Sequence, residues 1–166
     1  MADKEKLNDI RHSTAHLLAQ AVLEIYPDTK LTIGPVTTNG FFYDFLPTEN
    51  FKEEDLPIIE KKMHELAKQD FKIEGKQVTK DEARKLFKGN EFKQELIDGI
   101  EDETVGIYSQ GKFFDLCKGG HVPSTKELKH FKLTAISGSY WRADKSNTAL
   151  QRISGIAFET KGDLAL

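Results

Sequence analysis

The sequence lacks the features that mark several large classes of protein. It has one cysteine in 166 residues, which excludes an internal disulfide and suits a reducing compartment. It has no apolar run near the roughly 20 residues that cross a bilayer. Its charged first residues lack the apolar core of a signal peptide. It also shows no internal repeat and no low-complexity tract. We therefore expect a cytoplasmic protein with no membrane partner.

What the chain does contain suits one globular domain. Its residues are 38% hydrophobic and 31% charged, values typical of globular proteins with a true core. No linker divides the chain, so we predict a single domain over residues 1–166. Residues 161–166 resemble the first turn of a helix that stops at once, and we expect the domain to be excised from a longer protein.

Charge is unevenly spread along the sequence. Residues 1–110 carry 15 Lys/Arg and 22 Asp/Glu, a net charge of −7, whereas residues 111–152 carry 8 and 3, a net charge of +5. Such a basic segment suits a phosphate-bearing partner, although an ordinary solvated face gives the same pattern. Arg142, Lys145 and Arg152 are candidates for a basic rim.

Hydrophobic spacing and turn signals predict the secondary structure. Helices are expected from a cap at Asp3 or Asn8 to residue 25, and over 52–69, 79–87 and 91–97. Strands are expected over 31–37, 41–45, 71–78, 104–109, 112–116, 131–141 and 150–159. Because the order lacks regular βαβ alternation, we predict an α+β fold, with a mostly antiparallel sheet packed with a long N-terminal helix and further helices.

Two spaced pairs of residues carry the chemical information. His12 and His16 are four residues apart in a helical stretch and therefore share one face. Cys117 and His121 have the same spacing in a glycine-broken turn. Three imidazoles and a thiol can bind zinc, or can position a water molecule and move protons.

Two common readings of these pairs fail. A His-x-x-x-His helix is typical of zinc proteases, but Ser13 stands where that motif has its general-base glutamate. Cys-x-x-x-His is also not the Cys-x-x-Cys of a zinc finger. Each pair alone is a weak signal, and finding both in one small domain favours a functional site.

The segments around these pairs resemble the editing domain of bacterial threonyl-tRNA synthetases, and the two pairs are shared with alanyl-tRNA synthetase editing domains. The segments are Arg-His-Ser-Thr-Ala-His-Leu-Leu (11–18), Ile-Gly-Pro-Val (33–36), Asn-Gly-Phe-Phe-Tyr-Asp (39–44), Asp-Leu-Cys-Lys-Gly-Gly-His-Val-Pro (115–123), Ser-Tyr-Trp-Arg-Ala-Asp (139–144) and Leu-Gln-Arg-Ile-Ser-Gly-Ile-Ala-Phe (150–158). The last two point to the threonyl branch. One departure is Gly120, where the family usually has proline.

The resemblance implies a second-additional-domain type of fold and an aminoacyl-tRNA deacylase activity. Its substrate would be the 3′ acceptor end of tRNA(Thr) carrying serine, and its partner the remainder of the synthetase. The need is physical, because a threonine site discriminates against serine by only about 1–3 kcal/mol for one methyl group. Two alternatives stay open: a zinc-dependent trans-editing deacylase of mischarged tRNA(Ala), and a non-catalytic tRNA-binding appendage.

The resemblance also implies roles for single residues. His12 would contact the terminal ribose or the attacking water, with His16, Cys117 and His121 completing the catalytic pocket. Lys93 would position water or stabilise negative charge. Tyr43 and Asp115 would hold the adenosine or the seryl amine, and Arg142 would bind the acceptor end.

No cofactor is required by this resemblance, and zinc stays possible. If a metal is present, its ligands are His12, His16, Cys117 and His121. Elsewhere we expect structural roles: the phenylalanines at 41, 42, 45, 113 and 114 belong to core strands, His130 is structural, and His64 faces solvent.

Overall fold

A computed structural model describes residues 4–165 and confirms the α+β class. The chain forms two antiparallel sheets, in the strand orders β1-β2-β7-β6 and β3-β4-β5, where one mostly antiparallel sheet was predicted. The elements, in chain order, are α1 (Lys4–Ile25), β1 (Lys30–Leu31), β2 (Gly40–Leu46), α2 (Asp55–Lys68), β3 (Glu74–Thr79), α3 (Lys80–Leu86), α4 (Glu91–Asp98), β4 (Thr104–Gln110), β5 (Phe113–Leu116), η1 (Thr125–Glu127), β6 (His130–Tyr140), η2 (Trp141–Ala143), β7 (Ala149–Phe158) and α5 (Lys161–Ala165).

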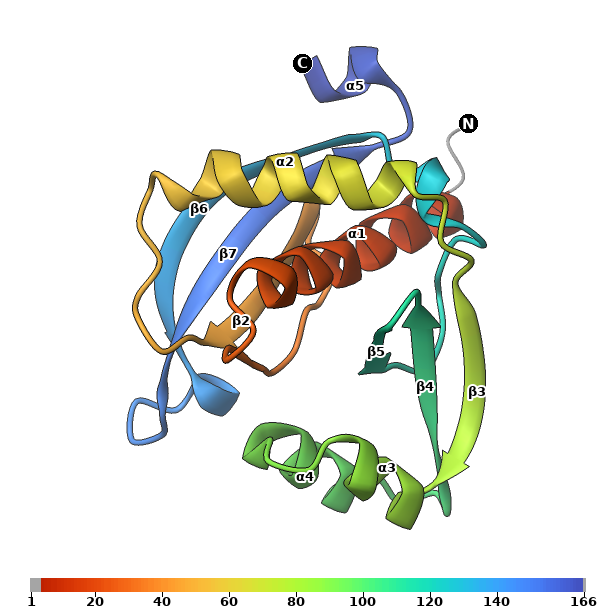
Figure 1. The fold of residues 1–166 in the computed structure, drawn as a ribbon, viewed down its shortest axis with the longest axis vertical. Coiled ribbons are helices and arrows are strands. Elements are labelled where there is room, and N and C mark those ends of the chain that lie inside the picture. Colours follow the sequence, from red (N-terminus) through yellow and green to blue (C-terminus); the bar gives the residue numbers. More distant parts are fainter. Residues whose placement is uncertain (1–3, 166) are drawn as a thin grey trace.

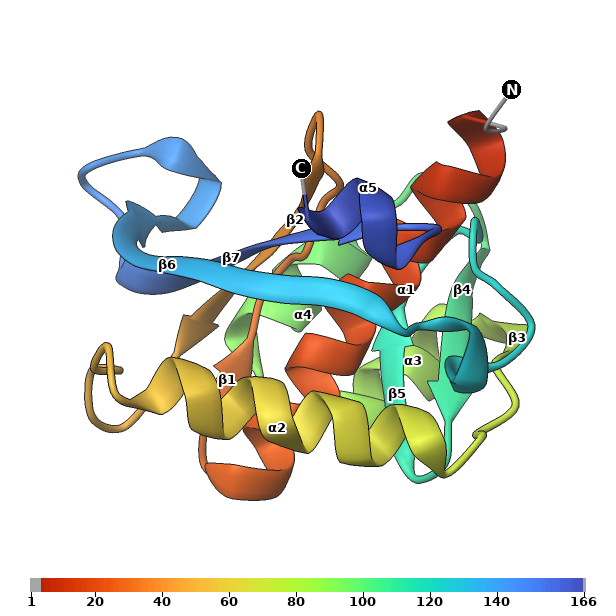
Figure 2. The same ribbon diagram turned by 90° about the horizontal axis from the view of Figure 1, so that it is seen from above.

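Helix α1 is the centre of the molecule. It lies with α2 against one face of the four-stranded sheet, while α5 lies on the other side (Figures 1 and 2). Its residues from Ile10 to Val22 are buried on nearly every face, as expected for a helix enclosed by its neighbours. Because the helix starts at Lys4, the cap predicted at Asn8 is wrong, and the alternative at Asp3 lies outside the described residues.

The three-stranded sheet and the pair α3–α4 form the other half of the fold (Figure 1). Thr79 and Glu82 form the predicted capping box at the start of α3. Asn90 caps α4 by accepting from the N–H groups of Phe92 and Lys93, and its side-chain amide donates to Leu31 O at 2.9 Å. These bonds fix the first turn of α4, including Lys93, against β1.

Two predicted strands are shorter than the sequence indicated. The pairing of 31–37 with β2 is regular only at Lys30–Leu31, because Thr32 and Ile33 both bond to the backbone of Asp44 and shift the register. The strand over 71–78 becomes regular only from Glu74. Before it, Phe71 and Ile73 bond to Thr125 and Pro123 instead of a sheet neighbour.

The phenylalanines predicted as core residues do pack in the interior. Phe41, Phe45 and Phe113 are buried. Phe42 and Phe114 are half-buried, the first beneath the guanidinium of Arg152 and the second against Phe87. No helix among residues 4–165 is long and apolar enough to cross a membrane.

Candidate functional site

Helix α1 supplies one wall of the candidate site. His12 and His16 share a face, with ring centroids 5.2 Å apart, as their spacing predicts. His16 is only 4% exposed, whereas His12 is half-buried. The two imidazoles therefore differ in their access to water, although they come from consecutive turns.

The segment after β5 supplies the opposite wall. Cys117 continues the sheet by donating its N–H to Gly106 O at 3.0 Å, and its Sγ accepts from Gly119 N at 3.3 Å. Gly120 then adopts a φ of +84°, which the ring of a proline cannot reach. The turn therefore takes a conformation that depends on glycine at this position, and it brings His121 back to α1.

The two pairs meet in space as a four-residue cluster. Cys117 Sγ lies 3.0 Å from His121 Nε2 and 3.5 Å from His12 Nε2. The His121 ring stacks on that of His12 with centroids 4.3 Å apart and lies 4.5 Å from that of His16. One donor atom from each of the four residues lies within 4.8 Å of the others. The geometry predicted from the two spacings is therefore present.

Burial makes this cluster electrically neutral. Desolvation lowers the pKa of His12, lowers that of His16 well below its usual value, and lowers that of His121 to about 2. Desolvation also raises the pKa of the Cys117 thiol to about 11. At neutral pH all four groups are uncharged, and His12, whose pKa is not lowered as far as those of His16 and His121, is the imidazole best able to take up a proton.

Ser13 joins the two walls. Its hydroxyl lies 2.8 Å from His121 Nδ1 and accepts from Val122 N at 3.0 Å, and the residue is fully buried. The position that argued against a protease thus holds the His121 ring in place. Spacing gives no signal for this role, because the contact depends on the turn of residues 117–121.

A buried charged network lies directly beside the cluster. Lys93 Nζ is 2.5 Å from Asp115 Oδ1, and it donates to Thr32 O at 2.6 Å and to Tyr43 Oη at 3.1 Å. Tyr43 donates in turn to Asp115 Oδ2 at 2.6 Å. Lys93 and Asp115 are 2% and 1% exposed, a degree of burial that charged groups reach only when paired.

Asp115 connects this network to the imidazoles. Its Oδ2 lies 3.6 Å from His16 Nε2, and Leu116 N donates to its Oδ1 at 2.8 Å. Burial first, and then the negative charge of Asp115, raise the pKa of Tyr43 well above its usual value. Tyr43 thus stays a hydrogen-bond donor. One continuous polar path therefore runs through Lys93, Tyr43, Asp115 and His16.

The Ile-Gly-Pro-Val segment explains how Tyr43 reaches this path. A Cβ atom at Gly34 would lie 2.2 Å from Tyr43 Cδ2, so only glycine lets the tyrosine ring lie against this backbone. Tyr43 is fully buried there. The glycine of this motif, which was noticed only by resemblance, is therefore required by the packing of Tyr43.

The proposed basic rim is largely neutralised by partners. Arg142 Nε lies 3.0 Å from Glu95, and Arg152 pairs with Asp44 through two bonds of 2.9 and 3.1 Å. These contacts do not involve the four-residue cluster. The prediction for His64 was wrong, because its ring is half-buried and stacks on Phe131 with centroids 4.2 Å apart.

The donor set of the cluster fits a divalent metal. Zinc bonds of about 2.0–2.3 Å in a tetrahedron place neighbouring ligand atoms about 3.3–3.8 Å apart, close to the separations seen here. Three imidazole nitrogens and one sulfur suit zinc, and Ser13 supports His121 from behind as an outer-shell group does. These four residues can therefore hold such an ion.

Comparisons with known proteins agree with this site. Residues 105–154 match the family described as "Threonyl and Alanyl tRNA synthetase second additional domain". The chain is 53% identical over 160 residues to a threonine–tRNA ligase of Rubrobacter xylanophilus, 52% over 164 residues to one of Bacillus velezensis, and 51% over 161 residues to one of Staphylococcus carnosus.

These matches cover 96%, 97% and 96% of this chain but only 25%, 26% and 25% of the relatives, so the chain spans about a quarter of their length. The family match includes most of β4, all of β5 and the Cys117–His121 turn, and the three relatives extend it over nearly all of the chain. Over residues 105–154 the chain is similar to the threonyl and alanyl tRNA synthetase second additional domains, and over nearly all of its length it is similar to a segment that makes up about a quarter of the threonine–tRNA ligases.

Proposed function

We propose that this domain hydrolyses the ester of Ser-tRNA(Thr), with the four-residue cluster and the Lys93–Asp115 network as its active site. The observation that carries the proposal is their direct contact. Three neutral imidazoles lie beside the buried Lys93–Asp115 pair, with Asp115 Oδ2 3.6 Å from His16 Nε2. Ester hydrolysis needs a base for water and positive charge for the oxyanion.

His12 is the base that this geometry favours. It is less buried than His16, and its hydrogen bond to the backbone of Gly120 and the charge of Asp115 oppose the desolvation that lowers its pKa. His121, with a pKa of about 2, is too weak a base at neutral pH and serves to position its neighbours. His12 would take the proton of the attacking water as the oxygen bonds to the seryl carbonyl carbon. The bond between the carbonyl carbon and the ribose oxygen then breaks, and that oxygen takes the proton from His12 as it leaves as a ribose hydroxyl, with free serine as the other product.

Lys93 would stabilise the negative charge that develops on the carbonyl oxygen by exchanging one of its present acceptors for that oxygen, because its three hydrogens already face Asp115, Thr32 and Tyr43. Tyr43 donates its single O–H to Asp115, so its role is to orient this network. Their hydrogen bonds to Asp115 and Thr32 hold them before substrate arrives, which is the condition for electrostatic catalysis. Both oxygens of Asp115 already face Lys93, Tyr43 and His16, so its predicted contact with the seryl amine requires these groups to shift.

The activity does not require a metal in this proposal, although zinc stays possible at His12, His16, Cys117 and His121. When bound, zinc would lower the pKa of a water molecule. The fit of the donor set therefore supports one alternative, a zinc-dependent deacylase of mischarged tRNA(Ala). The likeness to threonine–tRNA ligases favours tRNA(Thr), with the rest of the synthetase as partner and the cytoplasm as location.

The decisive experiment is single-turnover deacylation of Ser-tRNA(Thr) by the domain. We expect His12→Ala to lower the rate about a hundredfold or more, and His130→Ala, a histidine outside the cluster, to leave it unchanged. Equal rates for wild type and His12→Ala would overturn the catalytic assignment. Deacylation of Ser-tRNA(Ala) alone, lost after chelation, would favour the zinc alternative. RNA binding without any hydrolysis would indicate an appendage.

A further inference from the structure

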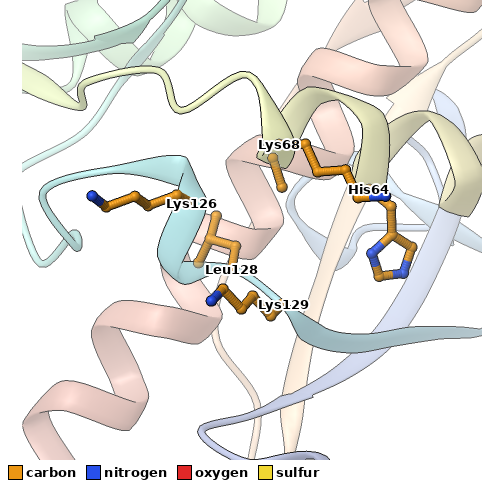
Figure 3. A pocket seen from close by; sticks show the side chains of 6 residues that line it. His64, Lys68, Lys126, Leu128 and Lys129 are labelled. Carbon is orange, nitrogen blue, oxygen red and sulfur yellow. The ribbon is translucent and has the colours of Figure 1, made fainter.

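A second pocket lies beside the turn that carries Cys117 and His121. It has a volume of about 380 Å³ and is bounded by the end of α2 on one side and by η1 and the residues after it on the other (Figure 3). The residues that line it are His64, Ala67, Lys68, Lys126, Leu128 and Lys129. Carboxylates are absent from this lining.

The three lysines of this pocket are exposed and form no ion pair among the described residues. Among residues 4–165 the ion pairs given by the structure involve other cations, and Lys68, Lys126 and Lys129 have none. Burial of the ring lowers the pKa of His64, the negative charge of nearby Glu60 opposes this, and Lys68 lowers the pKa further. The pocket therefore gathers three lysines for which the structure gives no ion pair, with the carboxylate of Glu60 close to the His64 ring.

The floor of the pocket is apolar and offers an aromatic ring. Ala67 and Leu128 are buried beneath it. The His64 ring is half-buried, with one face stacked at 15° on Phe131. Free cations around an aromatic platform are the combination by which proteins bind single-stranded nucleic acid, with phosphates on the cations and a base on the ring.

Hydrogen bonds hold the two sides of the pocket together. Thr125 in η1 accepts from Phe71 N at 2.8 Å through its side chain and donates its own N–H to Phe71 O at 3.0 Å, so η1 is fixed beyond the end of α2. Lys126 and Lys129 also border a neighbouring hollow with Glu127 and with Lys6, which pairs with Glu159 at 3.2 Å. The unpaired positive charge is therefore confined to the pocket itself.

We propose that this lysine pocket binds a phosphate and an adjoining base of a single-stranded RNA segment, outside the catalytic cluster. The inference rests on the proposed function to the extent that the RNA is the end of the substrate tRNA. An acidic protein surface is the rival occupant, but it would leave the His64 ring without a use.

The test is fluorescence anisotropy with a labelled RNA hairpin that has a single-stranded 3′ end, at several salt concentrations. We expect Lys126→Ala/Lys129→Ala to weaken binding and to reduce the slope of log affinity against log salt by about 1.4, or about 0.7 for each lost contact. Lys85→Ala/Lys88→Ala, which removes equal charge from exposed lysines in and just after α3, should change neither. His64→Leu should weaken binding about tenfold, and His64→Phe should retain it.

The proposal is overturned if the two double variants lose equal affinity, or if His64→Leu binds as well as His64→Phe. It is also overturned if the pocket variant loses affinity for polyglutamate but keeps it for RNA. Deacylation separates the two claims. A pocket variant with unchanged KM on Ser-tRNA(Thr) would refute the pocket alone. Lysine-dependent RNA binding by a domain that hydrolyses nothing would uphold the pocket and refute the proposed function.

Discussion

Replacing Asp115 by asparagine should destabilise the fold strongly, because it leaves the buried charge of Lys93 without its partner. In the native structure Lys93 Nζ lies 2.5 Å from Asp115, and both side chains are almost fully buried. In Asp115→Asn, the ammonium keeps only neutral oxygens close by, those of Thr32 and Tyr43 at 2.6 and 3.1 Å and the amide oxygen of the new side chain. The mutation changes the shape of the site very little, so the loss in unfolding free energy measures mainly the effect of removing the charge.

The expected magnitude follows from the pair geometry. Two unit charges 2.5 Å apart attract by about 7 kcal/mol at an effective dielectric constant of 20. The lost hydration of both groups offsets much of this energy in the intact pair. Removing one partner leaves the other charge buried alone, at a cost of about 3–5 kcal/mol. We expect Asp115→Asn and Lys93→Met each to lower the free energy of unfolding by about this amount.

Urea unfolding measures this loss, with the fluorescence of the single tryptophan, the buried Trp141, as the signal. The double variant Lys93→Met/Asp115→Asn should lose about 2–3 kcal/mol less than the sum of the single variants. Asp98→Asn is the control, because it breaks an exposed pair with Arg84 and should cost under about 1 kcal/mol. A loss below about 1 kcal/mol for Asp115→Asn, or strict additivity, would refute the reasoning.

Three further outcomes follow from the site. Ser13→Ala should lower kcat for deacylation about ten- to a hundredfold with little change in KM, because it frees the His121 ring; unchanged kcat would remove Ser13 from a positioning role. The free energy of unfolding should be highest above pH 6.5 and fall as the pH drops. The reason is that His16 and His121 bind protons in the unfolded chain but stay neutral in the folded one. Each should cost about 2 kcal/mol by pH 5, and urea midpoints independent of pH would contradict this. Cobalt should bind with a thiolate absorption band that Cys117→Ser abolishes, whereas chelator-treated protein should keep its deacylase rate; loss of that rate on chelation would make the metal essential.

Local patterns predicted most elements because they act over a few residues. The capping box at Thr79 and the helical spacing of His12 and His16 depend on backbone geometry within one or two turns. The strands predicted over 31–37 and 71–78 were too long. The first loses its regular register against β2 after Leu31, and the second begins late because residues 71–73 bond to residues 123–125, which lie far away in the sequence.

By itself the sequence determined the α+β class and the two spaced pairs, because hydrophobic period and helical spacing are properties of the local chain. Lys93 and Tyr43 were found by resemblance alone. Only the tertiary structure decided that the pairs share one neutral cluster, that Ser13 holds His121, and that Lys93 and Asp115 are paired beside it. Burial sets the charge of each group, and burial results from the packing of α1, α4 and the two sheets together.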